Sequence, residues 1–221
     1  MPTHSHPWDL SPQEARLLQK KLAGYVVREN RLGPVTMVAG VDVGLRDDAV
    51  QAAVVILNFP GLDIVDKAMA TRKVEFPYIS GLLSFREGPV ILDALEKLAT
   101  KPDLIIFDGQ GVAHPRRLGI ASHIGLLADL PAIGCAKSRL CGQHEETDFE
   151  RGSHVPLVDH GETIGAVVRT RNRIKPMYVS VGHRVDLRTS IKYVLACCRG
   201  YRLPETTRQA HRLAAALPEN S

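Results

Sequence analysis

Three β-rich runs follow one another near the N-terminus, with only turn residues between them, and this arrangement constrains the fold more than any other feature. The runs span residues 35–45, 49–59 and 62–74, and their connections contain Asp47-Asp48 and Pro60-Gly61. Connections this short join neighbouring strands that run in opposite directions. The segment therefore predicts a three-stranded antiparallel meander.

The rest of the sequence alternates predicted helices and strands. A capping-box pattern, Ser-Pro-Gln-Glu at 11–14, opens a first helix whose apolar positions are Leu17, Leu18, Leu22 and Tyr25. Apolar periodicity then predicts helices at 87–98, 118–130, 189–198 and 204–217, and strands at 103–107, 131–136, 155–158, 163–168 and 177–181. This order predicts an α/β domain of the ribonuclease H-like type, a mixed sheet in which parallel strands follow the antiparallel meander and helices cover both faces. Without a repeat or linker, we expect one domain over residues 1–221.

Composition restricts the class of protein. The chain of 221 residues carries a formal charge of +4, which permits nucleic-acid binding without requiring it. The four cysteines form no C-x-x-C pair and the start lacks a secretory signal pattern, so we expect a cytoplasmic protein with reduced thiols. No apolar stretch approaches the roughly 18 residues of a membrane span.

Two carboxylates lie at positions where a charge is costly. Asp42 lies inside an apolar strand, and Asp108 ends the apolar run Leu-Ile-Ile-Phe. In a meander followed by a crossover, the first and fourth strands become neighbours at the centre of the sheet, which would place the two side chains together. Adjacent carboxylates repel unless a cation lies between them, and hard oxygen ligands suit Mg²⁺, with Mn²⁺ as a substitute.

The residues that follow Asp108 suggest chemistry on a phosphodiester. Gly109 and Gly111 would allow close approach of backbone to a ligand, and Arg116 and Arg117 would supply charge for a phosphate. Taken alone, the segment supports equally well a strand end with a solvated Asp. Glu87, placed at the start of its predicted helix, is by itself a favourable partner of the helix dipole, but the crossover would let it complete a carboxylate cluster.

Five ordered motifs give a more specific indication. They are VAGVDVG at 38–44, PYISGLLSFREGP at 77–89, DGQGVAHPRRLGIASH at 108–123, CAKS at 135–138 and GYRLPETTRQAH at 200–211. Together they closely resemble the endonuclease V family of deoxyinosine-directed repair nucleases, over about residues 11–211. The resemblance implies an Mg²⁺-dependent enzyme that hydrolyses the second phosphodiester bond 3′ to a deaminated base and leaves 3′-hydroxyl and 5′-phosphate ends.

The resemblance also implies roles for single residues in catalysis. Asp42, Glu87 and Asp108 match the metal-binding carboxylates of the family, and Lys137 matches a lysine near the reacting phosphate. His211 matches a residue that completes the active site from the last helix, although a histidine at the boundary of that helix's apolar stripe (Leu203, Ala210, Leu213, Ala214, Leu217) is a serious structural alternative.

For base recognition, Tyr78 matches the wedge tyrosine that fills the gap left by the displaced base. Ser80 stands where the family commonly has a second proline, which puts the rigidity of the wedge in question. Gly81, Leu83, Gly109 and Gly111 match the loops of the base pocket. Arg86 and His114 are expected to orient phosphate or these loops, or to support a carboxylate.

Other polar patterns carry less weight. Arg169, Arg171, Arg173 and Lys175 alternate along a connection, for which we favour an exposed, solvated hairpin over a phosphate-binding surface. Cys141, His144, His154 and His160 fit no compact zinc motif, and His4 and His6 are expected on a frayed terminus.

The sequence also predicts the partners of the protein and leaves two alternative functions open. The expected partner is DNA that contains deoxyinosine, with uracil, mismatch and flap substrates cleaved less well, and the expected state is a monomer with no membrane association. Two alternatives remain at this point: a ribonuclease H-like nuclease that prefers inosine in RNA, and a module that binds the lesion without cleaving.

Overall fold

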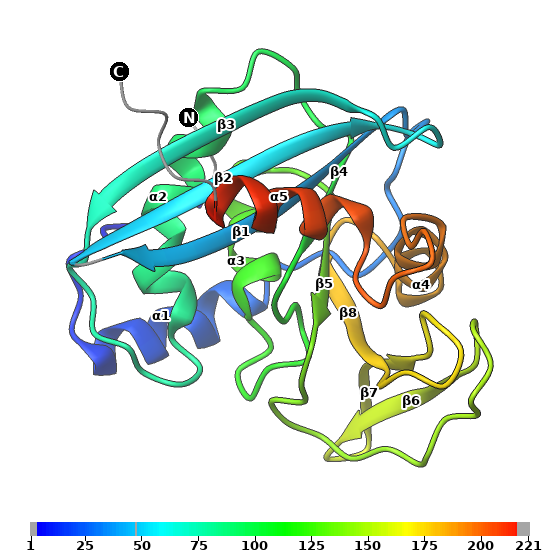
Figure 1. The fold of residues 1–221 in the computed structure, drawn as a ribbon. Coiled ribbons are helices and arrows are strands. Elements are labelled where there is room, and N and C mark those ends of the chain that lie inside the picture. The colour runs from blue at the N-terminus through cyan, green and yellow to red at the C-terminus, as the bar shows by residue number, and fades with distance from the viewer. Residues whose placement is uncertain (1–3, 47, 216–221) are drawn as a thin grey trace.

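The computed structural model describes residues 4–46 and 48–215, which form one eight-stranded mixed sheet with helices on both faces (Figure 1). The strand order is β3-β2-β1-β4-β5-β8-β7-β6. This architecture confirms the predicted α/β class, with a meander on one side of a parallel centre.

The predicted meander is confirmed nearly to its ends. It consists of β1 (Met37–Arg46), β2 (Ala49–Asn58) and β3 (Ile64–Lys73), all paired antiparallel. Most of β2 is buried, as expected for a strand covered on both faces. Strand β3 lies at the sheet edge, and most of its residues are exposed or half-buried.

The centre of the sheet is parallel. Strand β4 (Leu104–Phe107) pairs with β1 on one side and with β5 (Ala132–Ala136) on the other, in the same direction as both. All residues of β4 and β5 are buried, which explains their continuous apolar sequence. The first and fourth strands are therefore neighbours, as the sequence predicts.

Three further antiparallel strands complete the sheet. Strand β8 (Met177–His183) pairs with β5, β7 (Glu162–Val168) pairs with β8, and β6 (His154–Asp159) forms the far edge. Each of them confirms a strand that the sequence predicts.

Helices cover the two faces through two separate apolar clusters. On one face α2 (Leu83–Glu96) and α3 (Ile120–Ala128) pack on residues such as Val41, Ile105 and Phe107. On the other face α4 (Leu187–Ala196) and α5 (Glu205–Ala215) pack on alternate residues of the same strands, among them Val38 and Ile106. In Figure 1, α5 crosses β1 and β2 on the viewer's side of the sheet.

The first helix lies outside these layers. Helix α1 (Pro12–Ala23) has the predicted capping box at Ser11 and Glu14, and it buries Ala15, Gln19 and Leu22 against α2, α3 and their neighbouring loops. Two of its predicted apolar contacts are wrong. Leu17 is 60% exposed and Tyr25, beyond the helix, is 49% exposed, because the buried face follows the line of Ala15 and Gln19.

The start of α2 also differs from the prediction. The helix begins at Leu83, not at Glu87, and Glu87 consequently lies in its second turn. No side chain caps the start, but Leu82 and Phe85 are buried against α1, so tertiary packing extends the helix beyond its sequence signal.

The predicted apolar stripe of α5 (Glu205–Ala215) is described only as far as residue 215. The last residue of the predicted stripe on α5, Leu217, lies outside the described residues, while Ala210 and Ala214 are buried as expected. Within the described part of the chain, no helix has the length and apolar character needed to cross a membrane.

Candidate active site

The two aspartates meet where β1 and β4 run side by side. The parallel register pairs Val41 with Phe107, so Asp42 and Asp108 occupy the next positions on the two strands. Both line a cavity of about 240 Å³ together with Glu87, which reaches it from α2. The structure therefore brings the three predicted carboxylates to the wall of one cavity.

Burial and mutual repulsion perturb these acids. Desolvation, with the nearby charges of Asp42 and Asp108, raises the pKa of Glu87 to about 8. Desolvation also raises the pKa of Asp42, while its hydrogen bond with His211 opposes that rise. Excess negative charge gathered in a partly desolvated cavity is the electrostatic condition that a cation would relieve.

Two basic side chains face the aspartates. The ammonium group of Lys137, directly after β5, forms an ion pair with Asp108. His211 on α5 forms a hydrogen bond between its Nδ1 and Oδ2 of Asp42, 3.0 Å apart. His211 is exposed, so the structural alternative of a histidine satisfied by the core is wrong. The structure therefore places both residues beside the predicted carboxylates.

The donor set fits a hard divalent cation, although the side chains would have to turn to share it. Within residues 4–46 and 48–215, no group of three or more His, Cys, Asp or Glu side chains is gathered closely enough to hold an ion as it stands. Each aspartate instead has a basic partner, since Asp108 pairs with Lys137 and Asp42 with His211. Three carboxylates around one cavity nevertheless supply the oxygen ligands that Mg²⁺ and Mn²⁺ prefer.

A second, larger cavity of about 340 Å³ adjoins the first. Leu83, Asp108 and Ile120 line both cavities. The walls of the larger one also contain the predicted recognition residues Tyr78, Gly81, Gly109 and His114, together with Ser80, Gln110 and Lys137. Tyr78 is 75% exposed at its mouth, with the Arg86 guanidinium carbon 6.0 Å from its ring centroid.

Gly111 is the exception among the predicted pocket residues. It is buried and does not line the larger cavity, and a Cβ there would lie 2.0 Å from the carbonyl oxygen of Val181 on β8. Close packing against β8 explains why glycine is needed at this position, and its role in the base pocket stays a prediction. Gly109 does line the cavity, where a Cβ would meet Cγ2 of Ile120 at 2.6 Å.

One carbonyl group fixes the loop that carries Tyr78. The oxygen of Gly81 accepts hydrogen bonds from Gln19 Nε2 (3.0 Å), His114 Nε2 (3.0 Å) and Arg116 Nη2 (2.7 Å). Gly81 has a φ of +77°, which favours glycine, and a Cβ there would lie 2.9 Å from Arg116 Nη2. The wall of the larger cavity is therefore tied to α1 and to the loop after β4.

His114 works in this arrangement as a neutral group. Its Nδ1 accepts from the backbone N–H of Arg116 (3.1 Å), so its proton is on Nε2, which donates to Gly81. Burial, reinforced by the charge of Arg116, lowers the pKa of His114 to about 4. Of the predicted alternatives, the structure favours support of the loop over contact with phosphate.

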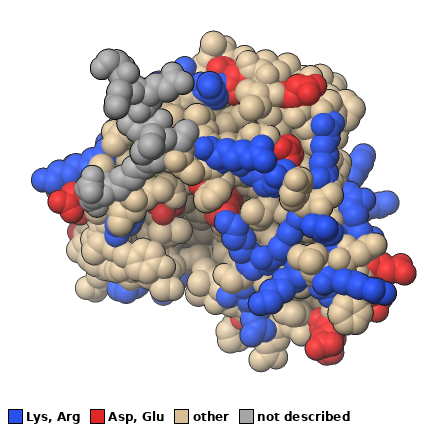
Figure 2. All heavy atoms as spheres, viewed as in Figure 1, with Lys and Arg blue, Asp and Glu red and all other residues tan. Residues whose placement is uncertain are grey.

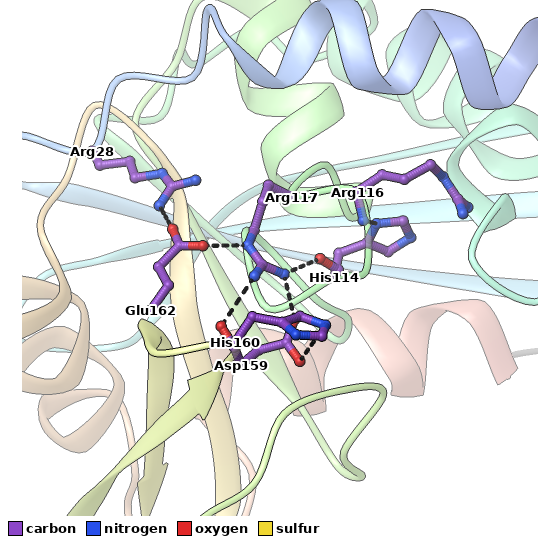
Figure 3. A network of polar contacts seen from close by, with 7 residues as sticks. All are labelled: Arg28, His114, Arg116, Arg117, Asp159, His160 and Glu162. Atoms are coloured by element: carbon purple, nitrogen blue, oxygen red, sulfur yellow. Dashed lines mark hydrogen bonds and ion pairs between the residues drawn. The ribbon is translucent and has the colours of Figure 1, made fainter.

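The two arginines after His114 are structural rather than free for a ligand. Arg116 donates to Gln19 and Gly81, and Arg117 pairs with Asp159 and Glu162 on the β6–β7 hairpin (Figure 3). Figure 3 also shows Arg28 bound to the same Glu162. The predicted use of these arginines for phosphate is wrong, because partners that are remote in sequence occupy both guanidinium groups.

Two other predictions fail for the same reason. Arg169 is 7% exposed and donates to the backbone of Thr147, Asp148 and Ile174, so it does not belong to a solvated hairpin. His6 is not frayed, because its Nε2 lies 2.8 Å from Nε2 of the buried His123.

Sequence reasoning missed three residues that support the site. Gln19 is 1% exposed in α1, and a polar residue on the buried line of that helix is the only signal that could have found it. Gln110 donates to the carbonyl of Ser138, and Arg202 donates to the carbonyl of Lys137. Their sequence context gives no indication of either contact.

The viewed face carries both signs of charge. Figure 2 shows Lys and Arg side chains gathered over the lower right, where β6–β8 lie in Figure 1, and a hollow to their left with acidic atoms at its rim. The exposed Arg171, Arg173 and Lys175 lie on the β7–β8 connection. Here the sequence prediction of exposed charge is confirmed.

Comparisons with known proteins agree with one family. The model of the endonuclease V family matches residues 20–212. Endonuclease V of Roseiflexus sp. (strain RS-1) is 54% identical over 209 residues, which cover 95% of this chain and 94% of that protein. The crystal structure of endonuclease V from Streptomyces avermitilis has a TM-score of 0.89 at 45% identity and covers 94% of this chain and 92% of that one.

A third relative was solved with a nucleic acid. Endonuclease V of Ciona intestinalis, in complex with a 24-mer DNA containing an inosine followed by a ribo-adenosine, has a TM-score of 0.78 at 26% identity and covers 91% of this chain and 95% of that one. Nucleases of this family are generally metal-dependent. With the family model matched over most of its length, the chain belongs to the endonuclease V family and is a nuclease.

Proposed function

We propose that the protein is a DNA-repair endonuclease that hydrolyses the second phosphodiester bond 3′ to deoxyinosine and leaves 3′-hydroxyl and 5′-phosphate ends. Mg²⁺ is the proposed metal, and Mn²⁺ a substitute. The adjacency of the two cavities carries the proposal, because Leu83, Asp108 and Ile120 line both. A displaced base in the larger cavity would have its 3′ phosphates beside the carboxylates.

The chain's own groups supply most of the chemistry. Asp42, Glu87 and Asp108 would hold the cation, which when bound lowers the pKa of a water and stabilises charge on the phosphate. The Lys137 ammonium, now paired with Asp108, is placed to contact a phosphate oxygen that approaches this carboxylate. His211 orients Asp42 through their hydrogen bond.

We propose that residues lining the larger cavity recognise the displaced base. Tyr78 is exposed at the mouth of that cavity, where a ring can replace the displaced base in the stack. Gly81, Leu83 and Gly109 bring backbone to its wall, so hydrogen bonds from the main chain can select the edge of hypoxanthine. The exposed cations beside the hollow suit the phosphates that flank the lesion.

The whole chain is proposed to act as one catalytic domain and as a monomer in the reducing cytoplasm. One sheet, together with the helices and loops packed on it, brings the proposed site residues together, and the four cysteines are free thiols. Light scattering on a size-exclusion column, with and without DNA, would test the monomer.

The decisive assay uses a labelled duplex with one deoxyinosine and a matched duplex with deoxyadenosine. With Mg²⁺, we expect a single cut, which a sequencing ladder should map to the second bond 3′ of the lesion. DNA ligase should reseal the nick directly, because the cut leaves a 3′-hydroxyl and a 5′-phosphate end. Asp108→Asn is the matched control. If the protein binds the deoxyinosine duplex but leaves it intact, the proposed nuclease activity is refuted and the alternative of a non-cleaving lesion-binding module is supported.

Inosine in RNA is a second candidate substrate, and one observation supports it. The DNA bound by the Ciona relative has a ribo-adenosine after its inosine. Strands that contain deoxyinosine or inosine, each followed by a deoxy- or a ribonucleotide, should be cleaved side by side. A strong preference for the ribonucleotide strands would overturn the assignment to DNA.

A further inference from the structure

Lys137 lies in an irregular segment, and its position depends on contacts from elsewhere. It directly follows β5, and the segment 137–140 has no regular secondary structure. Its side chain is 45% exposed, so packing alone does not fix it. A lysine that must meet a phosphate needs a fixed backbone, because its flexible stem otherwise spreads the ammonium over many positions.

Arg202 supplies this fixation. It lies in the connection between α4 and α5, and its Nη2 donates to the carbonyl oxygens of Lys137 (2.7 Å) and Pro176 (2.8 Å). Its Nε donates to the carbonyl oxygen of Lys175 at 2.8 Å. One planar guanidinium thus joins the Lys137 segment to the start of β8.

Arg202 is itself held in place. Its backbone carbonyl accepts a hydrogen bond from the hydroxyl of Thr170 at 2.6 Å, and Thr170 is 2% exposed. Among the described residues, no carboxylate forms an ion pair with Arg202, so its donors serve the backbone. The same connection leads into α5, which carries His211, and thereby ties the two basic residues of the site to one short segment.

We propose that Arg202 is a positioning residue, which holds the backbone of Lys137 so that its ammonium lies at Asp108 and at the reacting phosphate. The inference rests on the proposed function for its catalytic consequence, but the hydrogen bond to Lys137 can be tested without activity. Lysine could not replace Arg202 fully, because an ammonium lacks the fork that reaches several carbonyl oxygens at once.

Arg202→Gln is the test variant, and Arg199→Gln is its matched control. Arg199 lies in the same connection and donates to the carbonyls of Pro60 and Gly61, so its loss removes the same charge without touching Lys137. In single-turnover cleavage of deoxyinosine DNA, Arg202→Gln should be slower by about 10- to 100-fold, the scale for misplacement near 1 Å. Its affinity for the same DNA in Ca²⁺ should change less than about threefold, and Arg199→Gln should match the parent.

A double-mutant cycle separates positioning from general damage. In a Lys137→Ala background, Arg202→Gln should slow the reaction no further than about twofold, because the group it positions is gone. An equal loss in both backgrounds, or no loss in the single variant, would overturn the proposal. Arg202→Lys, which keeps the charge, should cleave at a rate between those of the parent and Arg202→Gln. It serves as the test variant if Arg202→Gln does not fold.

A spectroscopic measurement tests the contact between Arg202 and Lys137 independently of the proposed function. The ¹³C resonance of the Lys137 carbonyl, in labelled protein without DNA, should move in Arg202→Gln and not in Arg199→Gln. An unmoved resonance would refute the contact whatever the activity. If the parent leaves deoxyinosine DNA intact, the proposed function fails while this resonance still decides the position of Lys137.

Discussion

Gly40→Ala should act on the site through the packing of α5 on β1. A Cβ at Gly40 would lie 2.1 Å from the carbonyl oxygen of Thr206, in the first turn of α5. Ordinary contacts of this kind are about 3.5 Å, so the helix would have to retreat by more than about 1 Å. Overpacking of this size costs about 1–3 kcal/mol of the free energy of unfolding.

The same retreat would displace His211 from Asp42, since His211 is on α5 and Asp42 is two residues from Gly40 on β1. A misplacement near 1 Å is expected to slow cleavage by about 100-fold. Urea denaturation followed by circular dichroism gives the stability change, and single-turnover cleavage of deoxyinosine DNA gives the rate.

Gly44→Ala is the matched control, because Gly44 lies on the same strand and face and a Cβ there would meet nothing within 4 Å. It should be as stable as the parent within about 0.5 kcal/mol. The reasoning is refuted if Gly40→Ala unfolds at the same urea concentration as Gly44→Ala, since then α5 accommodates the methyl group without a cost.

The remaining predictions concern charge, the wedge and pH. Asp42→Asn and Asp108→Asn should each abolish nicking and leave folding intact by circular dichroism; undiminished nicking by either protein would defeat the assignment of the carboxylates. Tyr78→Ala should narrow the ratio of cleavage between deoxyinosine and deoxyadenosine duplexes while Mn²⁺ binding by calorimetry stays equal, and an unchanged ratio would count against the wedge. Because the pKa of folded His114 is about 4 and that of an unfolded histidine about 6.5, the unfolded chain binds the extra proton between these pH values. The parent should therefore lose up to about 3 kcal/mol more stability than His114→Gln as the pH falls from 6.5 to 4 in urea titrations, and parallel curves would disprove it.

The arrangement of the sheet could be predicted because it follows from local signals. The short connections around β2 fix the meander, and the crossover through α2 then makes β1 and β4 neighbours. Asp42 and Asp108 were found for the same reason, since each carboxylate interrupts or ends an apolar strand.

Residues whose partners are distant in sequence could not be assigned. Arg116 and Arg117 have the composition of a phosphate site, but Gly81, Asp159 and Glu162 occupy them, and no local pattern indicates those contacts. Arg202 illustrates the reverse case, because its tie to Lys137 joins positions 65 residues apart.

Glycine shows a similar limit. Gly109 and Gly111 look equivalent in the sequence, yet the first lines a cavity and the second packs against the backbone of β8. Which neighbour a missing Cβ makes room for depends on the tertiary structure, so the pattern predicts close approach without saying to what.

The most direct test of the central claim is a crystal structure with Mn²⁺ and an uncleaved inosine-containing duplex, in which the anomalous signal locates the metal. The account predicts an ion with carboxylate oxygens of Asp42 and Asp108 at about 2.1–2.2 Å, Glu87 beside it and the base in the cavity next to Tyr78. An ion bound elsewhere, with Asp42 and Asp108 still paired to His211 and Lys137, would contradict it.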